Sequence, residues 1–307
     1  ADNKTNQKAC FNALTQYGIY GPHNAITDAM DAAQMRQLGA AGVLQHLRSL
    51  SGVAQHVLYY GPLESTQVSR LVNEVHPMSE HPEAAHDGQF YTPLQVDESR
   101  VIIAPFQAKN TYMMGYSSRG EQFSLALKPY VGVFNEYFGG GMNSIVFQAL
   151  RESRGLAYNA SALFSQASRP SDREWFFTRI ITQNDKLKDC LKVFDEIVEQ
   201  MPQSESAFSL AREAVVKRLA TQRILREQIL DYYLRCRDQG LDDDPDKAVY
   251  EKVKTMTMAD LLAFHKREIA KRKYHLLLLG DEADWDMSSL QQRGAIQRVT
   301  LKDIFGY

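Results

Sequence analysis

Several stretches of the chain place apolar residues at helical spacing. Repeats of three and four residues between apolar positions are typical of helices that pack one face against a core. Pro202 follows the third stretch, and Gly240, after the fifth, is predicted to end its helix in left-handed backbone. The predicted helices cover residues 123–138, 142–150, 187–201, about 204–222 and about 225–238.

Other apolar runs are short and are bounded by residues that favour turns, which is typical of β-strands. A set of strands followed or interrupted by amphipathic helices indicates an α+β fold, in which an antiparallel sheet is backed by helices on one side. The sequence predicts one complete domain of this kind over residues 96–307. Its expected strands are RVIIAPF (100–106), TYMMGYS (111–117), LAYNASALF (156–164), REWFFTRIIT (173–182) and KYHLLLLG (273–280).

The N-terminal part of the chain resembles the C-terminal part at an offset of 219 residues. HVLYYGP (56–62) matches HLLLLGD (275–281), and the same offset aligns His46 with His265. An internal repeat of this length predicts two related structural units. Residues 1–75 are therefore expected to be the C-terminal part of a preceding homologous domain.

Residues 76–95 are rich in proline, histidine and acidic residues and have no apolar period, so they are predicted to be an interdomain linker. The opening segment has neither the basic nor the apolar region of a signal peptide and is expected to begin inside a longer structure. The sequence does not distinguish between a location in the cytoplasm and one in the periplasm of a bacterium. Three widely spaced cysteines, Cys10, Cys190 and Cys236, are expected to be buried thiols.

Charge and hydropathy exclude some partners. The formal net charge is −2, and 23% of the residues are charged, so electrostatics implies neither nucleic acid nor an anionic membrane as a partner. The basic segment 265–275 is interpreted as a solvated helix end. No apolar run approaches the roughly 20 residues that span a bilayer.

No metal site is predicted within this chain. His76, His81 and His86 are spaced by five residues and are interrupted by prolines, whereas zinc-binding helices place two histidines three or four residues apart. Neither H-E-x-x-H nor H-x-x-E-H occurs. The other histidines in helical or strand patterns are interpreted as structural: His46, His56, His265 and His275. No G-x-S-x-G or catalytic cysteine motif is present either.

The segment FQALRESRGLAYN (147–159) joins a predicted helix to a predicted strand through Gly155. Arg151 and Tyr158 flank this corner, and a rigid fan of donors beside a hydroxyl suits a peptide backbone or a carboxylate. A salt bridge with a partly buried tyrosine is the alternative. The preceding glycines at 139–141 favour either a tight packing turn or close approach of a bound chain.

The run NEYFGGGMNSIVFQALRESRGLAYNASALF (135–164) resembles the C-terminal half of the pitrilysin, or insulinase, family of zinc metallopeptidases. The characteristic features are a glycine-rich turn, Leu-Arg at a helix end and a tyrosine seven residues after that arginine. The family includes insulin-degrading enzyme and the mitochondrial processing peptidase, and the likeness favours a bacterial, processing-peptidase-like member. Carried over by position, the expected substrate-binding residues are Arg151, Tyr158, Gly139, Gly140, Gly141, Asn143 and Ser144.

The resemblance implies two halves that enclose an unfolded peptide substrate. The zinc motif belongs to the N-terminal half, on the same polypeptide or on a partner chain, so this chain is expected to bind no cofactor, to hold no catalytic residue and to be inactive alone. Zn²⁺ is expected in the missing half. The alternative function is a proteolytically inactive structural or assembly protein of the same fold.

Overall fold

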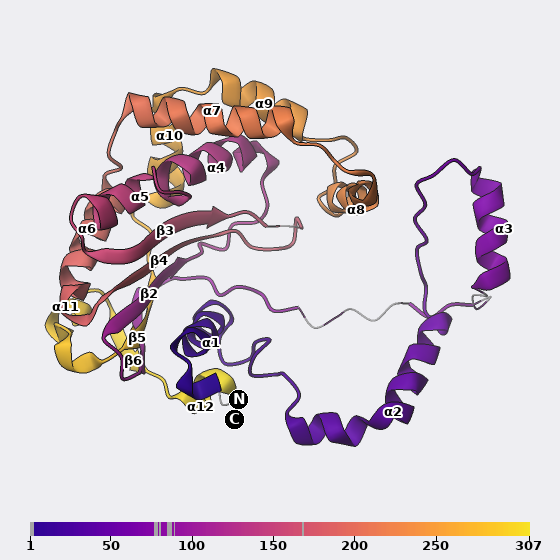
Figure 1. Cartoon of the computed structure of the whole chain (residues 1–307), viewed down its shortest axis with the longest axis horizontal. Coiled ribbons are helices and arrows are strands. Elements are labelled where there is room, and N and C mark those ends of the chain that lie inside the picture. Colours follow the sequence, from indigo (N-terminus) through magenta and orange to yellow (C-terminus); the bar gives the residue numbers. More distant parts are fainter. Residues whose placement is uncertain (1–2, 77–78, 80, 85–87, 89, 168) are drawn as a thin grey trace. The chain divides into compact units, whose positions relative to one another are not determined.

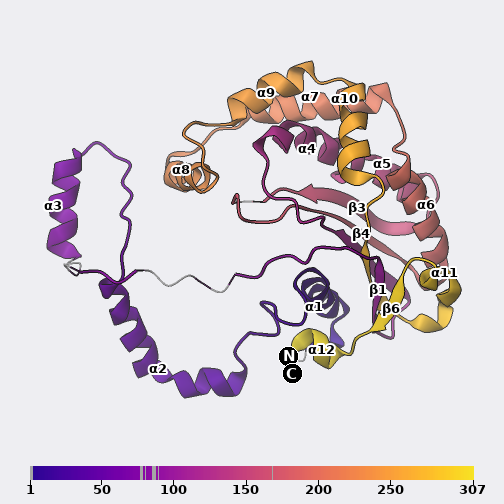
Figure 2. The same ribbon diagram turned by 180° about the vertical axis from the view of Figure 1, so that it is seen from behind.

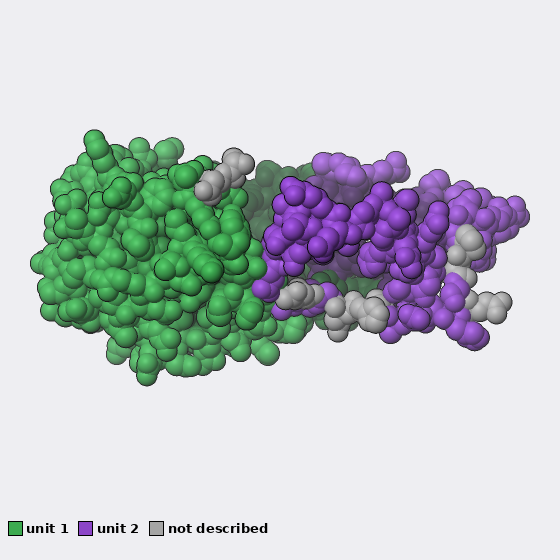
Figure 3. Space-filling view, turned by 90° about the horizontal axis from the view of Figure 1, so that it is seen from below, with its two compact units in different colours: residues 1–27, 91–223, 236–307 green, residues 28–90, 224–235 purple. Residues whose placement is uncertain are grey.

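The computed structural model describes residues 3–76, 79, 81–84, 88, 90–167 and 169–307. The chain forms two compact units, which Figure 3 colours separately: the first comprises residues 1–27, 91–223 and 236–307, and the second comprises 28–90 and 224–235. These units do not coincide with the expected boundaries at residues 75 and 95. Part of the expected linker lies outside the described residues, namely 77–78, 80, 85–87 and 89.

The predicted helices are present, with ends that differ from the prediction by a few residues. Two of them continue into π-helical turns, at Asn135–Gly139 and Gln148–Glu152. A helix that was not predicted, Met258–Phe264, continues into a third such turn at His265–Ile269. Gly240 has a φ of 71°, which confirms its predicted left-handed conformation. The helices are α1 (Gln7–Tyr20), α2 (Ala32–Ser49), α3 (Ser65–Val75), α4 (Lys128–Phe134), α5 (Ile145–Phe147), α6 (Leu187–Glu199), α7 (Glu205–Thr221), α8 (Ile229–Asp238), α9 (Asp246–Thr255), α10 (Met258–Phe264), α11 (Met287–Gln291) and α12 (Leu301–Phe305).

The first unit is built on a six-stranded sheet in the order β3-β4-β2-β5-β1-β6 (Figures 1 and 2). All the predicted strands are present, and a short edge strand that the sequence analysis did not predict completes the sheet. The strands are β1 (Arg100–Pro105), β2 (Asn110–Ser117), β3 (Ala157–Ser165), β4 (Trp175–Gln183), β5 (His275–Gly280) and β6 (Ala295–Arg298).

The α+β class is confirmed, and most of the sheet is antiparallel as expected, but the pairing of β1 departs from that expectation. Strand β1 pairs in parallel with both β5 and β6, whereas β2, β3, β4 and β5 pair antiparallel. Strand β5 lies between β1 and β2, although those two are neighbours in sequence. All six residues of β5 are buried. A continuous apolar run of this kind is stable only in the interior of a sheet that is covered on both faces.

Both faces of the sheet are covered, which corrects the expectation of helices on one side only. On one face, α4, α6 and α10 bury their apolar stripes against alternate strand residues such as Ile103 and Leu278, and α7 packs on the outside of α4 and its π-helical turn. On the other face, α1 and α12 pack against the intervening residues, including Met114 and Leu279 (Figure 1). Successive strand residues point to opposite faces, so β1 and β5 contribute to both cores.

Helix α1 lies close to the sheet because Gly18 has no side chain. A Cβ atom at Gly18 would lie 2.4 Å from Cδ1 of Leu277 in β5. Cys10 and Leu14 on the same helix are fully buried. Residues 3–27 are therefore part of the first unit, and the buried face of α1 contributes to its core.

The second unit contains α2 and α3, and neither helix has a buried residue. Gly39, with a φ of 58°, kinks α2. Residues 56–60, which match β5 in the repeat, lie outside regular secondary structure. Large apolar side chains of this unit are exposed, among them Met35, Leu38, Val43, Leu44, Leu47, Leu50, Val57, Tyr59, Tyr60, Leu63, Leu71 and Val75.

All three cysteines are buried thiols, as the sequence predicts. No helix within the described residues combines the length and the apolar content needed to cross a membrane.

Candidate functional site

The glycine-rich turn brings the π-helical turn Asn135–Gly139 against the edge strand β3. A Cβ atom at Gly139 would lie only 2.2 Å from the carbonyl oxygen of Ala162, and one at Gly140 would lie 2.6 Å from the carbonyl oxygen of Asn135. Backbone atoms cannot move away as a flexible side chain can, so packing by itself accounts for glycine at both positions. Gly141 is exposed and faces open space, which leaves its backbone accessible to a ligand.

Asn135 occupies part of the free edge of β3, a role that the sequence analysis missed. The backbone N–H of Phe164 donates to Asn135 Oδ1 at 2.8 Å, and Asn135 Nδ2 donates to the carbonyl oxygen of Phe164 at 3.0 Å. An edge strand otherwise presents unpaired backbone groups. The sequence showed an asparagine on the helix before a glycine turn. Its pairing with the Phe164 backbone could not be predicted, because it depends on the register of β3.

The two polar residues after the turn have different environments. Asn143 is exposed, whereas Ser144 is buried, and its hydroxyl oxygen has no hydrogen-bond partner among the described residues. The carbonyl oxygen of Ser144 accepts the N–H of Gln148 at 2.9 Å and thereby starts the helix. The Ser144 side chain is therefore not presented on the surface beside Arg151.

The helix that follows ends at a left-handed corner. Gly155 has a φ of 57°, which confirms the predicted turn, and its N–H donates to the carbonyl oxygen of Arg151 at 3.0 Å. The N–H of Leu156 donates to the carbonyl oxygen of Leu150 at 2.8 Å. Leu150 is fully buried and holds the helix end to the core. These contacts fix the backbone on both sides of the corner.

Arg151 lies on the surface, with its side chain 48% exposed. Its guanidinium stacks on the ring of Phe147 at 4.9 Å, and Nε lies 3.7 Å from a carboxylate oxygen of Glu152. A cation over an aromatic face at this distance is held weakly, and an exposed ion pair contributes less than about 1 kcal/mol. The guanidinium is thus oriented by its neighbours and still open to solvent.

Tyr158 projects from an irregularity in β3. The pairing of β3 with β4 shifts between Ala157 and Asn159, so Tyr158 has no opposing residue. Such bulges redirect a side chain and occur next to binding sites. Tyr158 is 55% exposed, and its hydroxyl accepts a hydrogen bond from Gln183 Nε2 at 3.0 Å. The bulge could not be read from the sequence, because it depends on the partner strand.

The histidines fall into two groups. His265 and His275 are buried in the core, in agreement with their structural interpretation, while His46 and His56 are exposed. His86 lies outside the described residues. Within the described ranges, no group of three or more histidine, cysteine, aspartate or glutamate side chains is placed to hold a metal ion.

Comparison with known proteins places this geometry in a family context. A family model described as "Peptidase M16 inactive domain" matches residues 52–215. The sequence matches no curated relative.

Solved structures share the fold at low sequence identity. A peptidase M16 inactive domain from Pseudomonas fluorescens aligns with a TM-score of 0.67 and 17% identity, over 92% of this chain and 68% of that one. A conserved protein from Enterococcus faecalis gives 0.71 and 14%, over 92% and 65%. A protease from Helicobacter pylori gives 0.54 and 12%, over 71% and 53%. The chain therefore spans about two thirds or less of the length of these proteins.

Proposed function

The chain belongs to the peptidase M16 inactive-domain family, and we propose that it is the non-catalytic, substrate-binding part of a zinc-dependent endopeptidase that encloses and cleaves unfolded peptides. The observation that carries this proposal is the pair of exposed side chains, Arg151 and Tyr158, on either side of the Gly155 corner. The alternative interpretation is a salt bridge with a partly buried core tyrosine. Arg151 does pair with Glu152, but this ion pair is exposed, and Tyr158 is 55% exposed, so both groups remain accessible to a substrate.

The zinc site is assigned to the other half of the enzyme. The sequence holds neither arrangement of the zinc-binding helix motif, and the described residues hold no metal-binding cluster. The residues that the structure describes therefore do not fit the ion. The zinc-bearing half is proposed as the partner, on the same polypeptide or on another chain.

Arg151 and Tyr158 are suited to binding and orienting a peptide backbone. The guanidinium has donors that face solvent. Because it already stacks on Phe147, its side chain loses less conformational entropy when it binds a ligand. The Tyr158 hydroxyl already accepts from Gln183, so its proton remains available to a substrate carbonyl oxygen. Fixed donors beside a scissile carbonyl stabilise charge that develops in the transition state.

The test is the activity of the complete enzyme with substitutions in this chain. Arg151→Ala and Tyr158→Phe are each expected to lower kcat/KM by at least about tenfold, which corresponds to roughly 1.4 kcal/mol. The matched controls are Arg154→Ala, at a half-exposed arginine on the same corner that pairs with Glu196, and Tyr307→Phe. Both controls should retain activity.

Wild-type kinetics in both test variants would contradict the proposal and would favour the structural or assembly function. A loss of folding is distinguished from a loss of binding by the thermal unfolding midpoint, which should change little because both side chains are exposed.

A further inference from the structure

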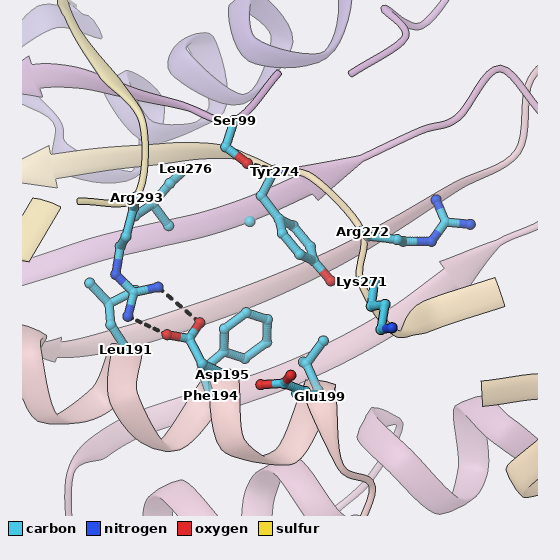
Figure 4. A pocket seen from close by; sticks show the side chains of 12 residues that line it. Ser99, Leu191, Phe194, Asp195, Glu199, Lys271, Arg272, Tyr274, Leu276 and Arg293 are labelled. Carbon is cyan, nitrogen blue, oxygen red and sulfur yellow. Dashed lines mark hydrogen bonds and ion pairs between the residues drawn. The ribbon is translucent and has the colours of Figure 1, made fainter. Parts of the chain in front are cut away.

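A cavity of about 360 Å³ lies between α6 and the sheet within the first unit (Figure 4). This volume is in the range of small-molecule sites. Its walls are largely apolar and aromatic, and polar groups occur at its two ends. The apolar walls come from Leu191, Phe194, Val198 and Leu276.

Tyr274 provides one wall and a polar group. Its ring lies against β2 where Gly115 has no side chain, since a Cβ atom there would lie 3.5 Å from the tyrosine ring. Ser99 Oγ accepts the backbone N–H of Tyr274 at 3.2 Å and fixes the entry to β5. The Tyr274 hydroxyl is buried and has no hydrogen-bond partner among the described residues.

A buried hydroxyl without a hydrogen-bond partner destabilises the fold, so this group is expected to bind a ligand or a water molecule. Burial also raises the pKa of Tyr274. The hydroxyl therefore remains protonated at neutral pH and can donate to an acceptor within the cavity.

Two charged side chains lie at the same end of the cavity as this hydroxyl. Figure 4 shows Lys271 and Glu199 at the end of the cavity toward which this hydroxyl points, and both residues are exposed to solvent. Within the part of the chain that the structure describes, neither forms an ion pair. Lys271 has a φ of 58°, an uncommon conformation for a residue with a side chain.

The other charges around the cavity are already paired. Asp195 accepts two hydrogen bonds from Arg293, one of them at 2.8 Å, at the opposite end of the cavity (Figure 4). Arg272 points away from the cavity and pairs with Glu121 at 2.5 Å. The groups available to a ligand are thus the ammonium group of Lys271, the carboxylate of Glu199 and the hydroxyl of Tyr274, next to the apolar part of the cavity.

We infer that this cavity binds a free amino acid with a large apolar side chain. The ammonium group of the ligand pairs with Glu199, its carboxylate pairs with Lys271 and accepts from the Tyr274 hydroxyl, and its side chain lies between Phe194 and Leu276. The inference goes beyond the proposed peptidase role and does not depend on it.

The charge arrangement favours a zwitterion over simpler ligands. A monocarboxylate would place a negative charge beside Glu199, and a neutral apolar molecule would leave Lys271 and Glu199 without partners. A second cavity, of about 660 Å³, shares Glu199 and Lys271 with the first and is also lined by His265. The buried Nε2 of His265 has no partner among the described residues. The volume of the second cavity leaves room for ligands that extend beyond the carboxylate.

The experiment is calorimetric titration of the full chain with L-phenylalanine. We expect saturable binding with a dissociation constant on the order of 0.1–1 mM. N-acetyl-L-phenylalanine lacks the ammonium charge and L-phenylalaninamide lacks the carboxylate, so each should bind at least about tenfold more weakly. The inference would be overturned if no binding occurred up to 10 mM, about ten times the upper end of the expected range of dissociation constants. Equal binding of all three compounds would also overturn it.

Variants locate the binding in this cavity. Tyr274→Phe keeps the ring and removes the unpaired hydroxyl, so the fold should be retained while affinity falls about fivefold to tenfold. Glu199→Gln should weaken binding at least about tenfold. The controls are Tyr112→Phe, on the opposite face of the sheet, and Glu213→Gln, which is exposed on α7. Binding that survives both test variants would place the ligand elsewhere and refute the assignment.

Discussion

Gly139 illustrates how one absent side chain positions two elements at the residue scale. Its place against the Ala162 carbonyl oxygen sets the distance between the π-helical turn and the edge strand β3. The sequence analysis assigned Gly139, Gly140 and Gly141 together to substrate binding. The structure accounts for the first two by packing and leaves Gly141 as the glycine of the three that remains a candidate for contact with substrate.

This difference predicts unequal effects of alanine along the turn. Gly139→Ala should destabilise the protein by about 3 kcal/mol, because backbone must move to accommodate the added methyl group. Gly141→Ala meets open space and should change stability by less than about 0.5 kcal/mol. Urea unfolding of both variants checks this, and equal stabilities would show that the close approach is not maintained in solution.

Glu174 is a second residue whose environment only the fold determines. Its side chain is fully buried, one carboxylate oxygen accepts the N–H of Ser124 at 3.3 Å, and the other has no partner among the described residues. Burial raises the pKa of Glu174 from 4.5 to about 7. The folded state therefore favours the protonated acid.

A raised carboxyl pKa makes stability fall as pH rises. The contribution of Glu174 to the free energy of unfolding is fully present below about pH 4.5. It is lost as pH rises through about 7, and the loss is up to about 3 kcal/mol. Glu174→Gln should flatten this decline when unfolding free energy is measured between pH 5 and pH 9. His265 and His275 have pKa values lowered by burial, so they weaken the fold only as pH falls below about 6.5. Parallel profiles for wild type and variant would refute the assignment to Glu174.

At the scale of elements, local periodicity predicted most helices and strands but not their arrangement. The run HLLLLG was identified as a strand, yet its central position between β1 and β2 follows from burial on both faces. A run of consecutive leucines, without polar alternation, was the feature that could have indicated it. Strand β6 was missed because its four residues, AIQR, carry no apolar period and depend on pairing with β1.

Helix α1 shows the same limit. The sequence analysis assigned it with residues 1–75 to a preceding domain, whereas its buried face completes the second layer of this sheet. Leu14→Ala should therefore cost about 2–4 kcal/mol in unfolding free energy, as for other fully buried leucines. Leu38→Ala on the exposed α2 is the matched control and should cost less than about 1 kcal/mol. A small effect at Leu14 would mean that α1 is not docked in solution.

At the scale of the whole molecule, the two units differ in how much apolar surface they bury. The first has cores on both faces of its sheet, whereas α2 and α3 of the second have no buried residue. Many large apolar side chains of the second unit are exposed, and exposed apolar surface of this kind marks sites that another chain segment covers. This surface supports the proposal that residues 28–75 complete a preceding homologous domain, in which 56–62 corresponds to β5.

Hydrogen exchange tests that proposal. In the present chain, amides of residues 56–60 should exchange rapidly, whereas those of β5 should be the slowest to exchange. When the proposed zinc-bearing half is present, residues 56–60 should gain protection of at least about a hundredfold, because a central strand pairs on both sides. No gain in protection, with the complex demonstrably formed, would refute the domain proposal while leaving the family assignment intact.

The sequence by itself determined what depends on neighbours along the chain: the helical stripes, most strands, the buried thiols, the left-handed Gly155 corner and the family resemblance that the comparisons confirm. Contacts between residues far apart in the sequence decided the rest. The strand order, the α1 layer, the bulge that exposes Tyr158 and the unpaired Tyr274 hydroxyl depend on packing partners. Backbone preferences are local, whereas burial and pairing are properties of the assembled fold.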